Sequence, residues 1–365
     1  MDKGAVVHHE RDSRAVTVVV DGRGGAAMRT FALERPIDLR FVLGLLVRGA
    51  GDPTARVASG AAIRASVTPA GPAAIELRVA GQELRAWAWG PGANELLDGV
   101  PALLGLDDDD TGFEPGHHPL IAALARRRGR VLLGRTGAVW EALLPAMLEQ
   151  RITGTEAWRN YRRLVRAHGE PAPGPLALYL PPTPAVIAGL ASWQLTSLGI
   201  EPRRGALLRR IARETPRYEA LAARARLAGG GGAGAVALAT ALRAQPGIGP
   251  WTAAEVTLRA LGDPDAVSVG DAHLSNVVAF ALAGRPRGTD EEMLALLAPW
   301  AGHRARVIRL LESSGVTPPR YGPRVTPRDL VREFSDSGPA DLHLGPRSGR
   351  GASRNRLRRR DRPYR

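Results

Sequence analysis

The first third of the chain contains short runs of β-forming residues separated by glycine, proline and polar residues. Two further stretches, 39–48 and 95–104, have apolar residues at helical spacing instead. Short runs bounded by turn residues are typical of strands in an antiparallel sheet. The pattern therefore predicts an α+β sheet domain over residues 1–112. The predicted strands are 16–20, 55–57, 62–67, 75–79 and 83–89.

From Pro119 to about Ser314 the apolar residues recur at helical spacing, which predicts an all-α domain over residues 113–318. Glycine and proline interrupt this pattern, and we expect the helices to end at these breaks. The run Gly229–Gly234 has neither the lysine nor the hydroxyl residue of a phosphate loop, and no strand precedes it, so it predicts a flexible linker. The breaks fall at 128–137, 169–182, 199–202 and 229–234.

Four adjacent carboxylates, Asp107–Asp110, mark the boundary between the two domains. Ligands for a hard cation are spaced along a loop rather than consecutive, so we interpret this run as a solvated linker and helix cap. After Pro318 the chain is rich in proline, glycine and arginine. Residues 319–365 are predicted to form a basic tail that is largely disordered beyond residue 336.

Residues 242–253, Leu-Arg-Ala-Gln-Pro-Gly-Ile-Gly-Pro-Trp-Thr-Ala, predict two helices joined by a tight hairpin. Pro246 ends the first helix because it has no amide hydrogen, and Pro250 suits the first turn of the second. Gly247 and Gly249 permit positive φ and a close approach of another molecule to the backbone. The amides at the start of the second helix carry partial positive charge and can bind phosphate. Nucleic acid, which has regularly spaced phosphates, is the predicted partner.

A carboxylate, Asp271, follows Gly249 by 22 residues, within the segment 269–274 and just before an apolar run. The residues alone allow two interpretations. An aspartate at the start of a helix caps free amides. A carboxylate in a site of low dielectric constant stabilises the positive charge that develops on a sugar as its bond to a base breaks. One residue can have both roles.

The hairpin and this carboxylate together resemble the motifs of the helix-hairpin-helix DNA glycosylase superfamily, and within it the bacterial 3-methyladenine DNA glycosylase II family. That family has an L-x-x-x-P-G-[IV]-G-x-[KW]-T-A hairpin, followed by a catalytic aspartate in a D-x-[HL]-[LI] context. Residues 142–150 are similar to its first core helix, and residues 39–105 to its N-terminal sheet domain. Pro299–Trp300 with Arg304 and Arg306 is similar to its closing helix. The resemblance covers roughly residues 35–320.

The resemblance implies that Asp271 is catalytic and that Trp251, Glu255 and Ala272 line the pocket for the base. The family has tyrosine at the last two positions, so the pocket here is expected to be roomier and poorer in aromatic rings. Cation–π selection of an electron-poor alkylated base is correspondingly weakened. Glu255 either reads a polar base edge or faces solvent. Trp300 is assigned to the core.

The resemblance also implies contacts with DNA. The family fills the gap left by a flipped nucleotide with the residue after the loop glutamine, which is Arg151 here. Its guanidinium plane can stack between bases. His273 orients the local backbone or packs. Carbonyls of the family's hairpin hold a monovalent cation, so Na⁺ or K⁺ is implied at the backbone of Gly247 and Gly249. The predicted DNA-binding residues are Gln150, Arg151, Gly247, Ile248, Gly249, Pro250, Thr252 and His273.

The composition fits a polyanionic partner. The formal charge is +14, and residues 347–365 alone contain nine arginines and one aspartate. This end either aids solubility or acts as a DNA tether whose affinity falls with salt. Because the chain has no cysteine, disulfides, thiolate zinc sites and cysteine-ligated iron–sulfur clusters are excluded. The pairs His8–His9 and His117–His118 lack acidic partners at useful spacing, so no metal site is predicted there.

The sequence has no apolar run of about 18 residues and no secretion signal, so we expect a cytoplasmic, nucleoid-associated monomer. Trp251 occupies the position where bifunctional relatives have the lysine that forms a Schiff base, and Lys3 is the only lysine. We therefore predict a monofunctional glycosylase, without lyase activity or organic cofactor, that removes alkylated purines such as 3-methyladenine or 7-methylguanine from double-stranded DNA. The alternatives are a glycosylase for deaminated bases, hypoxanthine or uracil, and a non-catalytic DNA-structure-binding paralogue.

Overall fold

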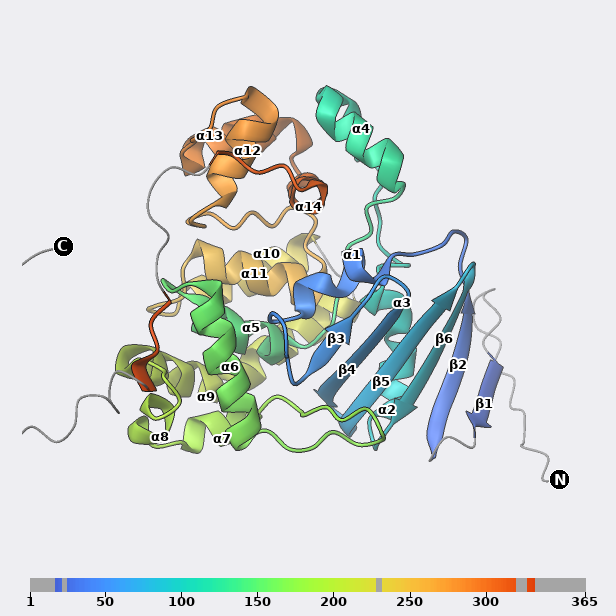
Figure 1. The fold of residues 1–365 in the computed structure, drawn as a ribbon, viewed down its shortest axis with the longest axis vertical. Helices are drawn as coiled ribbons and strands as arrows, with labels where there is room; N and C mark the ends of the chain where they lie inside the picture. The colour runs from blue at the N-terminus through green and yellow to red at the C-terminus, as the bar shows by residue number, and fades with distance from the viewer. Residues whose placement is uncertain (1–16, 22–24, 228–231, 320–326, 332–365) are drawn as a thin grey trace, which may run out of the picture.

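The computed structural model describes residues 17–21, 25–227, 232–319 and 327–331 (Figure 1). Within this part of the chain one antiparallel sheet has the strand order β1-β2-β6-β5-β4-β3. The α+β class of the N-terminal domain and its antiparallel sheet are thus confirmed. The strands are β1 (Thr17–Asp21), β2 (Ala26–Ala32), β3 (Ala55–Val57), β4 (Ala61–Thr68), β5 (Gly71–Ala80) and β6 (Glu83–Trp89).

The predicted strands are present with shifts of a few residues at their ends, but β2 was not predicted. Its sequence, Ala-Ala-Met-Arg-Thr-Phe-Ala, contains few β-branched residues, and so gives a weak strand signal. β2 lies between β1 and β6 and pairs with both. Pairing on both sides, rather than local preference, therefore accounts for this strand.

Both helices predicted in the sheet domain are interrupted. The first divides into α1 (Leu39–Leu43) and the 3-10 turn η1 (Gly44–Leu46). The second divides at Gly99 into α2 (Ala93–Asp98) and α3 (Val100–Leu103). Asp38 caps α1, because its Oδ1 accepts from the amides of Arg40 and Phe41 at 3.0 and 3.4 Å.

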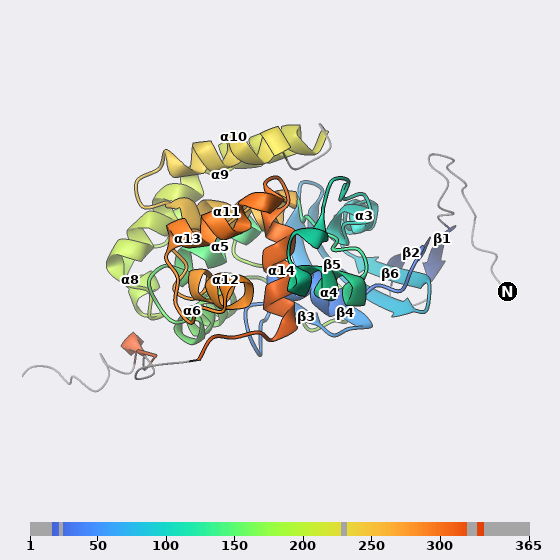
Figure 2. The ribbon, with the colours of Figure 1, turned by 90° about the horizontal axis from the view of Figure 1, so that it is seen from above.

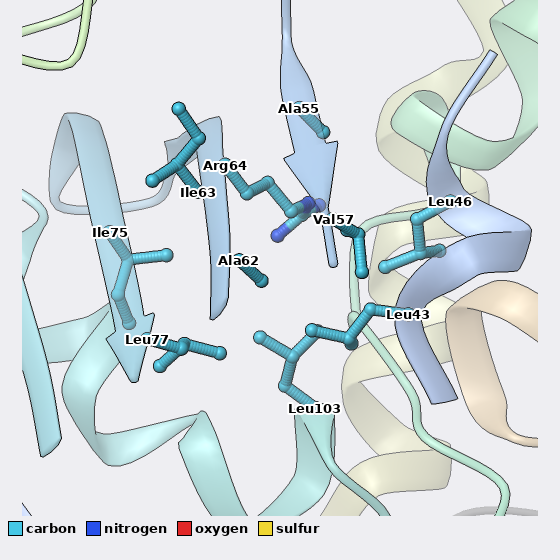
Figure 3. A pocket seen from close by; sticks show the side chains of 10 residues that line it. All are labelled: Leu43, Leu46, Ala55, Val57, Ala62, Ile63, Arg64, Ile75, Leu77 and Leu103. Atoms are coloured by element: carbon cyan, nitrogen blue, oxygen red, sulfur yellow. The ribbon is translucent and has the colours of Figure 1, made fainter. Parts of the chain in front are cut away.

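A small cavity lies between the sheet and α1–η1 (Figure 3). Its volume is about 10 Å³ and nine of its ten lining side chains are apolar, the exception being Arg64. This volume is at the lower limit for one water molecule, so the cavity is a packing defect and not a binding site. The lining residues are Leu43, Leu46, Ala55, Val57, Ala62, Ile63, Arg64, Ile75, Leu77 and Leu103.

The rest of the described chain is helical, which confirms the predicted all-α domain, and the first three predicted breaks fall between helices. Of the linker predicted at Gly229–Gly234, residues 229–231 lie outside the described residues. The prediction is wrong for Gly232–Gly234, which belong to α10. The helices are α4 (Pro119–Arg128), α5 (Val139–Glu149), α6 (Gly154–His168), α7 (Pro184–Gly189), α8 (Ser192–Thr196), α9 (Pro202–Leu227), α10 (Gly232–Arg243), α11 (Pro250–Leu261), α12 (Leu274–Ala283), α13 (Asp290–Leu297) and α14 (Arg304–Ser314), with 3-10 turns η2 (Pro115–His117) and η3 (Ala298–Trp300).

Two large hydrophobic cores hold the fold together. One is built from α5 to α11. The other combines the inner face of the sheet with α4 and α12 to α14, and buries Trp300 as predicted. Figure 1 shows this division: α12 to α14 and α4 lie together, apart from the bundle of α5 to α9. Figure 2 shows α14 beside α4. The chain crosses from the first core to the second between α11 and α12. The domain boundaries predicted from sequence remain predictions.

The interpretation of Asp107–Asp110 as a solvated linker is wrong for Asp108. Its side chain is 9% exposed and pairs with Arg306, which is fully buried. Arg306 also donates to the carbonyls of Val131 and Asp109 at 2.6 and 2.7 Å. Asp107 and Asp110 pair with arginines at the surface, and the guanidinium of Arg130 lowers the pKa of Asp110. The run therefore clamps the loop to α14, an arrangement that spacing alone does not reveal.

Residues 327–331 return to the body of the protein and contact α6. Asp329 pairs with Arg163 through two hydrogen bonds of 2.9 and 3.1 Å, and the amide of Arg328 donates to Glu156. The predicted disorder beyond residue 336 and the arginine-rich end lie outside the described residues. Among the described helices none is long and apolar enough to cross a bilayer. The described residues also contain no metal-binding cluster, and His8–His9 lies outside them.

Candidate functional site

The hairpin between α10 and α11 has the predicted form. Gly247 adopts φ +88°, a conformation that favours glycine, whereas Gly249 has φ −94° and so does not use the freedom predicted for it. A Cβ at Gly249 would have no neighbour within 4 Å. The first helical bond of α11 runs from the amide of Ala253 to the carbonyl of Gly249, so the amides of Trp251 and Thr252 precede it. The turn therefore presents open backbone at a helix N-terminus.

Gln150 joins the end of α5 to this hairpin. Its Nε2 donates to the carbonyl of Gly247 at 3.0 Å and to Oγ1 of Thr252 at 2.9 Å. Its own carbonyl accepts from Arg204 of α9 at 2.7 Å. The predicted glutamine is thus next to the hairpin, where it fixes the turn. The monovalent cation predicted at the hairpin carbonyls remains a prediction.

Arg151, the next residue, has φ +56°, one of two positive values among the described residues other than glycine. Its side chain is exposed. The left-handed conformation costs about 1 kcal/mol or more for a residue with a Cβ, and such strain clusters at functional sites. The fixed Gln150 and the capped start of α6, where Thr153 accepts from the amide of Glu156, hold the loop on both sides.

Asp271 is half-buried and its two oxygens have different partners. Oδ1 accepts from the amides of His273, the N-cap of α12, and Leu274, its first residue, at 2.8 and 2.9 Å. The carboxylate thus caps free amides at the start of the helix, as one interpretation predicted. Oδ2 accepts from Nε1 of Trp251 at 3.1 Å. The cap fixes the carboxylate group and directs its second oxygen toward the hairpin.

The contact between Trp251 and Asp271 spans the two hydrophobic cores. Trp251 packs against the core of α5 to α11, whereas Leu274, at the start of α12, belongs to the core shared with the sheet. The carboxylate is half-buried beside an indole ring, where the two cores meet. A fixed charge acts more strongly where water is excluded.

Glu255 lies one turn after Trp251 on α11 and faces neither solvent nor an open polar site. Its Oε1 accepts from Oγ of Ser268 at 2.7 Å and its Oε2 pairs with Arg259 at 2.8 Å. The side chains of the ion pair are 15% and 10% exposed. The sequence predicted that Glu255 either contacts a polar base edge or faces solvent, and the ion pair was not predicted. Glutamate and arginine at positions i and i+4 of a helix commonly pair, so the sequence did contain a signal for it.

The remaining predicted residues divide into buried and exposed ones. Ile248 and Thr252 are buried, with 5% and 2% of the whole residue exposed, so neither presents its side chain to DNA. Ala272, His273 and Pro250 are exposed. Sequence reasoning did not find the arginines of α9 that hold the site: Arg204 binds Gln150, and Arg210 binds Gln245 and the carbonyl of Pro246.

The sequence matches no family model and no curated protein. The structure is similar to solved DNA glycosylases. One is the 3-methyladenine DNA glycosylase of Archaeoglobus fulgidus, with a TM-score of 0.64 and 19% identity over 77% of this chain and 96% of that one. Another is the 8-oxoguanine glycosylase/lyase of Clostridium acetobutylicum in complex with double-stranded DNA, with a TM-score of 0.59 and 12% identity over 83% and 98% of the two chains. The chain therefore has the fold of the helix-hairpin-helix DNA glycosylases.

Proposed function

We propose that this protein is a monofunctional DNA N-glycosylase that flips a damaged base out of the duplex and hydrolyses its bond to deoxyribose. The observation that carries the proposal is the position of Asp271, 3.1 Å from the indole nitrogen of Trp251 and beside a hairpin with open backbone. The fold shared with DNA glycosylases supports it.

The residues suggest how the reaction would proceed. Hairpin amides would bind backbone phosphate, and the flipped nucleotide would place its sugar near Asp271. As the bond to the base breaks, positive charge develops on the sugar, and a carboxylate held by two amides stabilises that charge without reorganising. The same carboxylate can orient the water that adds to the sugar, leaving an abasic site.

We propose alkylated purines as the substrates, since the half-buried indole of Trp251 lies beside Asp271 and would stack on an electron-poor base. One observation favours deaminated bases as the second candidate: Glu255 and Ala272 contribute no aromatic ring. Duplexes that each contain one lesion, 7-methylguanine, hypoxanthine or uracil, distinguish the two after alkali cleaves the abasic sites formed. Cleavage of the 7-methylguanine duplex alone supports the first class, and cleavage of only the other two supports the second.

The absence of a lysine from the hairpin predicts that the enzyme does not nick DNA. A Schiff base requires an amine, and Lys3 is the only lysine in the chain. We expect borohydride to trap no covalent complex with lesion-containing DNA, and strand breaks to appear only after alkali. A trapped complex that persists in a Lys3→Ala variant would contradict the monofunctional mechanism.

Arg151 is expected to occupy the gap left by the flipped nucleotide. A 2-aminopurine placed opposite the lesion brightens when its neighbour leaves the stack. We expect Arg151→Ala to reduce this signal several-fold, because the guanidinium no longer stacks between the bases. The exposed Arg166, at the far end of α6, provides the control. If Arg166→Ala reduced the fluorescence signal equally, the effect would come from the loss of a positive charge and not from stacking of Arg151.

A further inference from the structure

We infer that Glu255 and Ser268 are positioning residues that set the orientation of Asp271, an inference that rests on the proposed catalytic role of that aspartate. Ser268 lies three residues before Asp271, in the loop between α11 and α12. Its hydroxyl donates to Oε1 of Glu255 at 2.7 Å, and its carbonyl accepts from the amide of Asp271 at 3.1 Å. Glu255 therefore holds the backbone from which the Asp271 side chain extends.

Trp251, Glu255 and Arg259 occupy successive turns of one face of α11. Trp251 contacts the carboxylate of Asp271, and Glu255 holds the loop that carries it. One rigid helix thus controls both the side chain and the backbone of the aspartate. Groups held on a rigid element keep their geometry better than groups on a free loop.

Arg259, one turn further along α11, holds the Glu255 side chain in place. Its Nη1 pairs with Oε2 of Glu255 at 2.8 Å and also donates to the carbonyl of that residue at 2.9 Å. Its Nε donates to the carbonyl of Leu45, in η1 of the sheet domain, at 3.0 Å. The Asp271 loop is thereby braced against the sheet domain through Glu255 and Arg259. A hydrogen bond to a charged carboxylate, as at Ser268, is stronger than one between neutral groups.

The family that the sequence resembles has tyrosine at the position of Glu255. These contacts explain why glutamate can occupy this position without contacting the base. Both carboxylate oxygens of Glu255 already have a protein partner, and its side chain is 15% exposed. A base edge would have to displace either the hydroxyl or the guanidinium. We therefore assign Glu255 to supporting the loop that carries Asp271, and not to contact with the substrate.

The test measures the single-turnover rate of base release and, separately, the affinity for a duplex with a non-cleavable abasic-site analogue. In Ser268→Ala and Glu255→Gln the hairpin is intact, so we expect affinity to stay within about twofold. The rate should fall roughly tenfold to a hundredfold, since misplacing a reacting group by about 1 Å can cost that much. Ser268→Thr retains the hydroxyl and is expected to restore most of the rate.

Glu141 supplies a matched control. Like Glu255, it pairs with an arginine, Arg64, and accepts a hydrogen bond from a serine hydroxyl, that of Ser66, at 2.6 Å. The side chains of Glu141 and Arg64 are 12% and 13% exposed. Ser66→Ala should leave the rate unchanged. Equal rates for Ser268→Ala and wild type, or equal rate losses in Ser268→Ala and Ser66→Ala, would overturn the inference. No base release by the wild type itself would instead refute the proposed function.

Discussion

Replacing Asp271 by asparagine is expected to lower the single-turnover rate of base release by at least about 10³-fold, which corresponds to ~4 kcal/mol of transition-state stabilisation. The substitution removes the charge that opposes the developing positive charge on the sugar. It retains an oxygen that can accept from the amides of His273 and Leu274, so the cap of α12 is preserved. DNA affinity should therefore change little, and filter binding measured with the kinetics separates the two effects.

Asp38 provides the control, because its carboxylate caps α1 through the amides two and three residues ahead, the same pattern as at Asp271. Asp38→Asn removes an equivalent charge from a cap in the sheet domain. We expect this variant to release base at the wild-type rate. An Asp271→Asn variant that is as active as Asp38→Asn would show that the Asp271 carboxylate is only a cap.

Asp108→Ala is expected to destabilise the protein by about 3–5 kcal/mol, the cost of removing one partner of a buried ion pair. It leaves the fully buried guanidinium of Arg306 without its counter-charge, and the amide of Leu133 loses its acceptor. Urea unfolding followed by circular dichroism measures the change in the free energy of unfolding.

The neighbouring pair of Asp110 and Arg130 tests whether burial is the cause. Their side chains are 26% and 42% exposed, so Asp110→Ala should cost only about 0–1 kcal/mol. Comparable losses in the two aspartate variants would contradict a special role for the buried pair.

Local sequence chemistry was sufficient to predict the hairpin and one role of Asp271, that of accepting hydrogen bonds from free amides at the start of a helix. Pro246, Gly247 and Pro250 restrict the backbone so strongly that the helix end, the turn and the next helix follow from their covalent structure. The strands from residue 55 onward were predicted for a related reason, since turn residues bound each of them. In these segments local preference and tertiary structure agree.

Features that depend on distant partners could not be predicted. β2 forms because two strands pair with it, and Asp108 is buried because Arg306 lies 198 residues later in the chain. The contact between Glu255 and Ser268 was missed for the same reason, because Ser268 lies beyond the end of α11. Periodicity and spacing describe which face of an element a residue occupies, but they do not identify what meets that face.

Excision of damaged bases is tested by using mass spectrometry to identify the bases that the wild-type protein releases from methylated duplex DNA. We expect free 3-methyladenine or 7-methylguanine with the wild type and none with Asp271→Asn. Absence of any released base, while salt-sensitive binding to the same duplex is retained, would contradict this expectation.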